Sequence, residues 1–203
     1  MDPICRELPA TAGFSLLHQE LYEDMLRLVS QLDLAVANAE QRSIEFRHAG
    51  DEVRAKLALA SPEAQMYSRA VQVFAAMAVE AALNCYGLMW FGEAGFEKYF
   101  KRCPTVPKLK KLAKICAGKE LNDTDEIVRL ASSLMVKRNA HVHPRAEESS
   151  PDAQGVFRIV TQKRQPRRYP SAGHEAAAEL NRFLELFAGL DRRTASFFLP
   201  RAV

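Results

Sequence analysis

The sequence lacks the short motifs that mark common metal and nucleotide sites. Its four cysteines form no Cys-x-x-Cys pair, which excludes a zinc ribbon and a thioredoxin-like site. It contains no Gly-x-Gly-x-x-Gly, no phosphate-binding loop, no Gly-x-Ser-x-Gly and no His-Glu-x-x-His. We therefore expect no cofactor and no metal. We expect the cysteines to be reduced, as in a cytoplasmic protein.

A long, uninterrupted apolar run is also missing. The most apolar stretch, residues 73–91, contains Glu80 and Asn84, and a charge at mid-bilayer depth is costly. The N-terminal residues have no basic patch followed by an apolar run, so we expect no secretory signal. These features predict a cytoplasmic protein without a membrane span.

The composition is that of an ordinary globular protein. The chain has 203 residues, of which 48% are hydrophobic and 26% charged, with few glycines and prolines. This length fits a single domain over residues 1–203. The net charge of +3 permits nucleic acid as a partner without requiring it.

Apolar residues recur at three- and four-residue spacing, which predicts helices. We expect one from 15 to 48, a break at Gly50, and a helical segment over 51–59. Ser61 and Pro62 form a good helix start, and the central apolar helix should run from there to 90 or 91. Short helices are expected over 95–101 and 108–117, the latter closed by Gly118.

A further helix is predicted over 124–143, where Pro144 stops it. Residues 145–172 read as a loop or insertion, with a short strand-like segment near 156–161. A last helix is expected over 173–198. The fold class is therefore all-α: a helical bundle with a core over 15–144 and an added C-terminal helix.

One cluster stands out where an apolar helical stripe ends. Arg138, Asn139, His141 and His143 arrive within six residues, directly before Pro144. This pattern resembles the HEPN family, whose domains carry Arg-x(4 to 6)-His at the end of a helix, often with a polar residue after the arginine. Four residues separate Arg138 from His143, and Asn139 takes the polar position. The resemblance covers about residues 62–144 and includes the central helix.

The resemblance implies a HEPN-type bundle and metal-independent cleavage of single-stranded RNA. In this interpretation Arg138, Asn139 and His143 are catalytic: histidine titrates near neutral pH, and arginine offers a forked donor to phosphate. The family usually dimerises so that two motifs face one groove. We expect an RNA-binding homodimer, such as a toxin or defence effector with a neutralising partner protein.

A structural interpretation remains open beside the catalytic one. Arg138, His141 and His143 are favoured at a helix C-terminus by the helix dipole alone. The chain would then be a catalytically inactive helical module that binds nucleotide, nucleic acid or a partner protein. The apolar helix also contains Glu80, which is costly to bury unpaired. Its expected partner is Arg138 or Arg182, in a supporting or a purely structural role.

Two basic stretches could follow an RNA backbone. Lys108, Lys110, Lys111 and Lys114 crowd one short helix. The second stretch, for which we favour nucleic-acid binding, contains Arg164, Arg167, Arg168 and Tyr169, with the tyrosine as a stacking platform. Solvated surface is the alternative for both.

Overall fold

The computed structural model describes residues 17–142, 169–192 and 195–198, and these ranges are helical with no strand. The all-α class is therefore confirmed. The strand-like segment expected at 156–161, the arginines of the second basic stretch and His143 lie outside the described residues. The helices are α1 (Leu17–His48), α2 (Glu52–Leu59), α3 (Pro62–Tyr99), α4 (Thr105–Ala117), α5 (Glu126–Val142), α6 (Tyr169–Ala188) and α7 (Ala195–Phe198).

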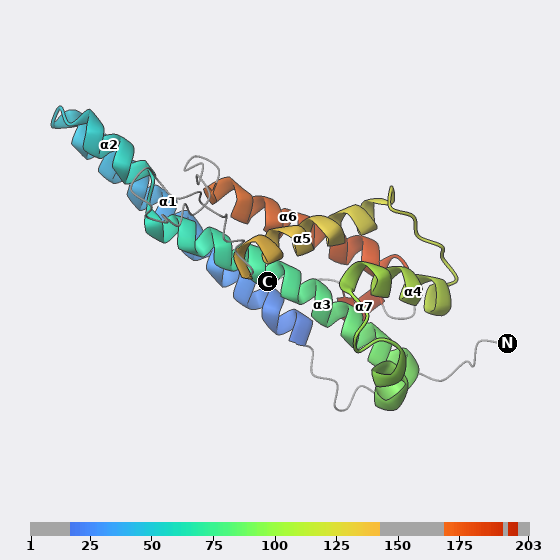
Figure 1. The fold of residues 1–203 in the computed structure, drawn as a ribbon. Coiled ribbons are helices and arrows are strands. Elements are labelled where there is room, and N and C mark those ends of the chain that lie inside the picture. The colour runs from blue at the N-terminus through green and yellow to red at the C-terminus, as the bar shows by residue number, and fades with distance from the viewer. Residues whose placement is uncertain (1–16, 143–168, 193–194, 199–203) are drawn as a thin grey trace, which may run out of the picture.

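Helix α3 is the centre of the bundle. Helices α1, α5 and α6 pack along it, α2 extends beyond its N-terminal end beside α1, and α4 covers its C-terminal half (Figure 1). The alanine-rich segment of α3 explains this close packing, because side chains of one carbon let neighbouring helices approach. Its fully buried residues are Ala75, Ala76, Ala78, Val79 and Ala82. Other helices of the same chain therefore cover this alanine-rich segment.

Local signals explain where the helices begin and end. The Ser61 hydroxyl accepts a hydrogen bond from the amide of Ala64 at 3.3 Å, with Pro62 at the first position of α3. The expected end of this helix at 90 or 91 falls at a kink rather than a stop. Gly92 has φ 64° and ψ 176°, and the helix resumes beyond it to Tyr99. Gly118 ends α4 in the left-handed conformation.

The C-terminal helix differs from the prediction. It begins at Tyr169 rather than 173 and ends at Ala188, and the short α7 follows. A buried aromatic cluster accounts for this turn. The Phe198 ring lies 4.9 Å from that of Phe187 and 5.9 Å from that of Tyr86. One straight helix to residue 198 could not return Phe198 to this cluster, because each further residue adds about 1.5 Å along the axis.

The stretch Glu52–Tyr99 is long and apolar enough, by length and composition alone, to cross a membrane. Half of its most apolar window is buried inside the bundle. The core helix of a soluble protein passes the same test, so this property is weak support for a membrane span.

Candidate functional site

Helix α5 directs Arg138 toward the middle of α3. One guanidinium nitrogen, Nη1, lies 3.9 Å from Glu80 Oε1, and the two side chains remain 30% and 35% exposed. This distance is an ion pair but is longer than a hydrogen bond. The carboxylate therefore orients the guanidinium, while its exposed part stays accessible to solvent.

Glu80 is itself positioned by the first residue of α4. The Thr105 hydroxyl donates a hydrogen bond of 2.9 Å to Glu80 Oε1, the same oxygen that faces Arg138. Thr105 is buried, so its hydroxyl is a fixed donor. Three helices thus meet at one carboxylate oxygen, and the direction of Arg138 depends on all three.

One turn further along α3, a second polar contact joins α3 and α4. The buried Lys108 ammonium donates to Asn84 Oδ1 at 2.7 Å and lies 5.4 Å from the centre of the Phe96 ring. Burial lowers the pKa of Lys108, and the nearby Glu80 carboxylate opposes that shift. Lys108 therefore places a positive charge beside Glu80, inside the protein rather than on its surface.

His141 contacts α3 further toward its N-terminus. Its Nε2 lies 3.1 Å from Gln72 Oε1 and donates to that oxygen, since a carboxamide oxygen can only accept. Gln72 is buried and its amide donates in turn to the Ser68 carbonyl oxygen at 3.1 Å. This chain of contacts anchors the last turn of α5 to the central helix.

The structure thus brings two of the predicted site residues, Arg138 and Glu80, together. Asn139 is exposed, and His143 lies outside the described residues. The alternative pairing of Glu80 with Arg182 is wrong. Arg182 instead forms hydrogen bonds to both carboxylate oxygens of Glu126, at 2.9 and 3.1 Å. It lies on α6, which packs against another side of α5.

The lysines of α4 do not form one basic surface. Besides the buried Lys108, Lys110 pairs with Asp123 at 2.7 Å and Lys114 pairs with Glu120 at 2.9 Å. These acidic partners neutralise two of the four charges. Lys111 alone among them is exposed with no acidic partner in the described part of the chain.

The second basic stretch lies almost entirely outside the described residues. Tyr169 is the exception, and it forms the first residue of α6 rather than a loop residue. Its predicted role as a stacking platform, and the phosphate contacts expected of Arg164, Arg167 and Arg168, stay predictions.

Sequence reasoning missed Thr105 and placed Lys108 on a basic surface, although the spacing of both residues carried a signal. Both residues lie on the stripe of α4 that is buried, together with Leu109, Leu112 and Cys116. A lysine at three- and four-residue distance from buried positions is on the inner face of a helix. It must then find a partner, which here is the polar stripe of α3.

No group of three or more histidine, cysteine or acidic residues with metal-binding geometry occurs in the described ranges. Cys85 and Cys116 are buried free thiols, and burial raises the pKa of Cys85 to about 11. A thiol of that kind stays protonated and is a poor nucleophile at neutral pH. Comparisons of the chain with protein-family models, with curated proteins and with solved structures find no match.

Proposed function

We propose that the protein is a metal-independent endoribonuclease of the HEPN type that cleaves single-stranded RNA. The observation that carries this proposal is the position of Arg138. Its half-buried side chain is oriented by Glu80, and in the sequence it takes the motif position of the family's phosphate-binding arginine.

The chemistry uses the adjacent 2′-hydroxyl of the RNA as the nucleophile. A base removes its proton, the oxygen attacks phosphorus, and the 5′-oxygen leaves with a proton from an acid. Histidine can act as a general base or a general acid near neutral pH, so we assign these transfers to His143. Arg138 stabilises the charge on the pentacoordinate phosphorus through its planar fork of N–H donors. The products carry a 2′,3′-cyclic phosphate and a 5′-hydroxyl.

One chain supplies one Arg138 and one His143, whereas the reaction needs both a base and an acid. A symmetric homodimer brings a second copy of each residue to the same phosphate. Asn139, exposed beside Arg138, orients the phosphate or the histidine. A toxin or defence effector of this kind needs a neutralising partner protein in the cell.

The test is cleavage of a single-stranded RNA in the presence of EDTA. The wild-type protein should cut RNA to 2′,3′-cyclic phosphate ends and leave DNA intact, because DNA lacks the 2′-hydroxyl. His143→Ala should lower the rate by about a hundred- to ten-thousand-fold. Arg138→Ala should do the same, and Arg138→Lys should restore little, because lysine lacks the fork.

His141→Ala serves as the matched control. It removes a histidine two residues from His143, and its described contact is with Gln72 rather than with Arg138. We expect a much smaller loss of rate than for His143→Ala. Cutting that persists in His143→Ala would show that the activity comes from another site or from a contaminant.

A second candidate is a catalytically inactive module that binds nucleotide, nucleic acid or a partner protein. The observation that favours it is the same ion pair, because the Glu80 carboxylate partly neutralises Arg138 and weakens its attraction for phosphate. In that case varied single-stranded RNAs should bind without being cut, and Arg138→Ala should change the thermal stability only.

A further inference from the structure

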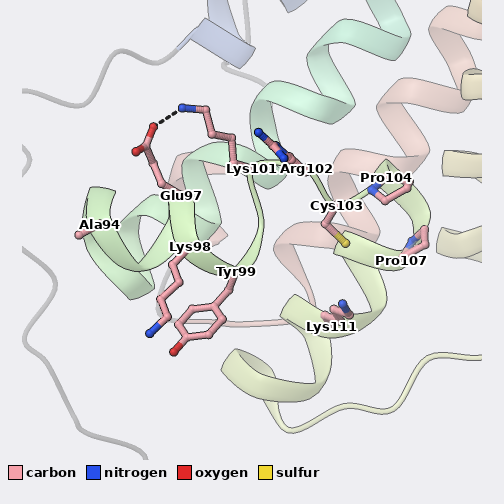
Figure 2. A pocket seen from close by; sticks show the side chains of 10 residues that line it. All are labelled: Ala94, Glu97, Lys98, Tyr99, Lys101, Arg102, Cys103, Pro104, Pro107 and Lys111. Carbon is pink, nitrogen blue, oxygen red and sulfur yellow. Dashed lines mark hydrogen bonds and ion pairs between the residues drawn. The ribbon is translucent and has the colours of Figure 1, made fainter.

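An open pocket of about 920 Å³ lies where the end of α3 meets the start of α4. Figure 2 shows its lining side chains, which come from the last two turns of α3, the connecting loop and the first turns of α4. It is separate from the Arg138 cluster, although the two share the first turn of α4: Pro104 lines the pocket, and the next residue binds Glu80.

The pocket is basic. Four cations line it, Lys98, Lys101, Arg102 and Lys111, against a single acid, Glu97. Glu97 pairs with Lys101. The other three cations are exposed, and no acidic partner for them occurs in the described ranges. Three such charges around one hollow attract an anion with more than one negative charge.

An apolar hollow of about 380 Å³ adjoins the basic pocket and shares two of its residues, Tyr99 and Lys111. Phe91, Phe100 and Ile115 complete its lining. Tyr99 is 60% exposed and Ile115 is 57% exposed. The Lys98 ammonium lies over the Tyr99 ring, 5.2 Å from its centre, so a positive charge and an aromatic ring adjoin at the pocket.

We propose that this double pocket binds a nucleoside phosphate, with the base on Tyr99 in the apolar hollow and the phosphate among Lys98, Arg102 and Lys111. A planar base attached to a phosphate dianion matches both halves. Inorganic phosphate uses only the basic half, and an acidic side chain of a peptide carries no flat ring beside its charge. The nucleoside phosphate is either a free nucleotide or one residue of a single-stranded RNA.

The proposal does not depend on catalysis by Arg138, since it concerns binding at another surface. It is tested with AMP, adenosine and inorganic phosphate as probes, by calorimetric titration of the full-length protein. AMP should bind more tightly than either adenosine or phosphate. Tyr99→Ala should weaken AMP about tenfold, while Tyr99→Phe keeps the ring and most of the affinity.

Charge reversal tests the basic half. Arg102→Glu and Lys111→Glu should each weaken AMP by tenfold or more and leave adenosine little affected. Lys56→Glu is the matched control: it is equally exposed, but lies on α2 at the opposite end of the bundle. Equal binding of AMP by all these variants, or an equal loss with Lys56→Glu, would overturn the proposal.

Cys103 provides a readout that needs no variant. It lines the basic pocket and is partly exposed, so saturating AMP should slow its alkylation by iodoacetamide, followed by peptide mass spectrometry. Unchanged alkylation together with no calorimetric binding refutes the site. A fluorescently labelled five-nucleotide RNA separates the two sources. If fluorescence anisotropy shows that this RNA binds more tightly than AMP and that AMP displaces it, the pocket receives RNA. If AMP binds and the RNA does not, the pocket receives a free nucleotide.

Discussion

At the scale of single residues, the sequence identified Arg138 and Glu80 but could not relate them to their surroundings. A carboxylate in an apolar helix predicts a basic partner, and for Glu80 the sequence left both Arg138 and Arg182 as candidates. The choice between them depends on helix packing, which brings α5 rather than α6 over Glu80. The burial of Lys108 was hidden by its neighbours, because a run of lysines resembles a solvated surface.

His18 is a buried titratable residue outside the candidate site. Its Nε2 donates to the Phe197 carbonyl oxygen at 2.8 Å, and the ring lies 5.2 Å from that of Phe198. The other ring nitrogen, Nδ1, is buried, and the described residues offer it no hydrogen-bond partner. Burial lowers the pKa of His18 below 6.5, because a second proton would bring an unsolvated charge.

We therefore expect acid to weaken the protein through His18. Between the lowered folded-state pKa and 6.5, the unfolded chain binds more protons than the folded one, so stability falls as the pH falls through this window. His18→Gln keeps an amide donor for Phe197 but does not titrate. Thermal unfolding from pH 7.5 to 5 should show a flatter dependence for this variant than for the wild type.

His48→Gln is the comparison for that experiment, because His48 is exposed at the end of α1. Its melting temperatures should follow those of the wild type across the pH range. A His18→Gln profile as steep as the wild-type profile would assign the acid sensitivity to another group.

At the scale of helices, the starts were easier to predict than the ends. Ser61 and Pro62 act locally, so the beginning of α3 was correct. The prediction of separate helices before and after Gly92 found the break but missed that α3 resumes directly beyond it. The turn after Ala188 was missed because it depends on Tyr86, which is 105 residues away from its hydrogen-bond partner Asp191.

Gly92 and Gly118 provide a test of what the backbone requires. Both have a φ of 64°, but ψ is 176° at Gly92 and 18° at Gly118. The first combination is accessible almost only to glycine, whereas asparagine tolerates the second. Neither site has an atom within 4 Å of an added Cβ. A substitution at either site therefore tests backbone strain without adding a steric clash.

We expect Gly92→Asn to lower the free energy of unfolding by about 1–3 kcal/mol. Gly118→Asn should cost less than about 1 kcal/mol, since asparagine is a common C-cap residue. Urea denaturation followed by circular dichroism measures both variants. Equal losses would mean that the kink at Gly92 relaxes into ordinary helix, and that α3 is not broken there in solution.

At the scale of the whole molecule, hydrophobic periodicity was sufficient for the all-α class and for a central apolar helix. It was not sufficient to say which faces that helix buries. Its alanines are covered by α1, α5 and α6 of the same chain. A dimer therefore has to use a surface that is still exposed, and α5 offers one at Val136.

Two apolar side chains of α5 are exposed: Val136, which is 66% exposed, and Val142, which is 44% exposed. Val136 itself lines a hollow of about 450 Å³, together with Val106, Val128 and polar side chains such as Ser132 and Ser133. A two-fold contact at this face would bury Val136 of both subunits, because each subunit supplies the same surface. Val136 and Arg138 are two residues apart and therefore point to different sides of α5, so such a contact lies away from the Arg138 side of the helix.

We expect light scattering at micromolar concentration to give about twice the chain mass of 22.8 kDa. Val136→Glu should shift the protein toward the monomer, because it would place a charge inside the contact. Met66→Glu is the matched control, as Met66 is 54% exposed and lies in the first turns of α3. A monomer at every concentration that still cuts RNA would show that one motif suffices, and a stable dimer in Val136→Glu would place the interface elsewhere.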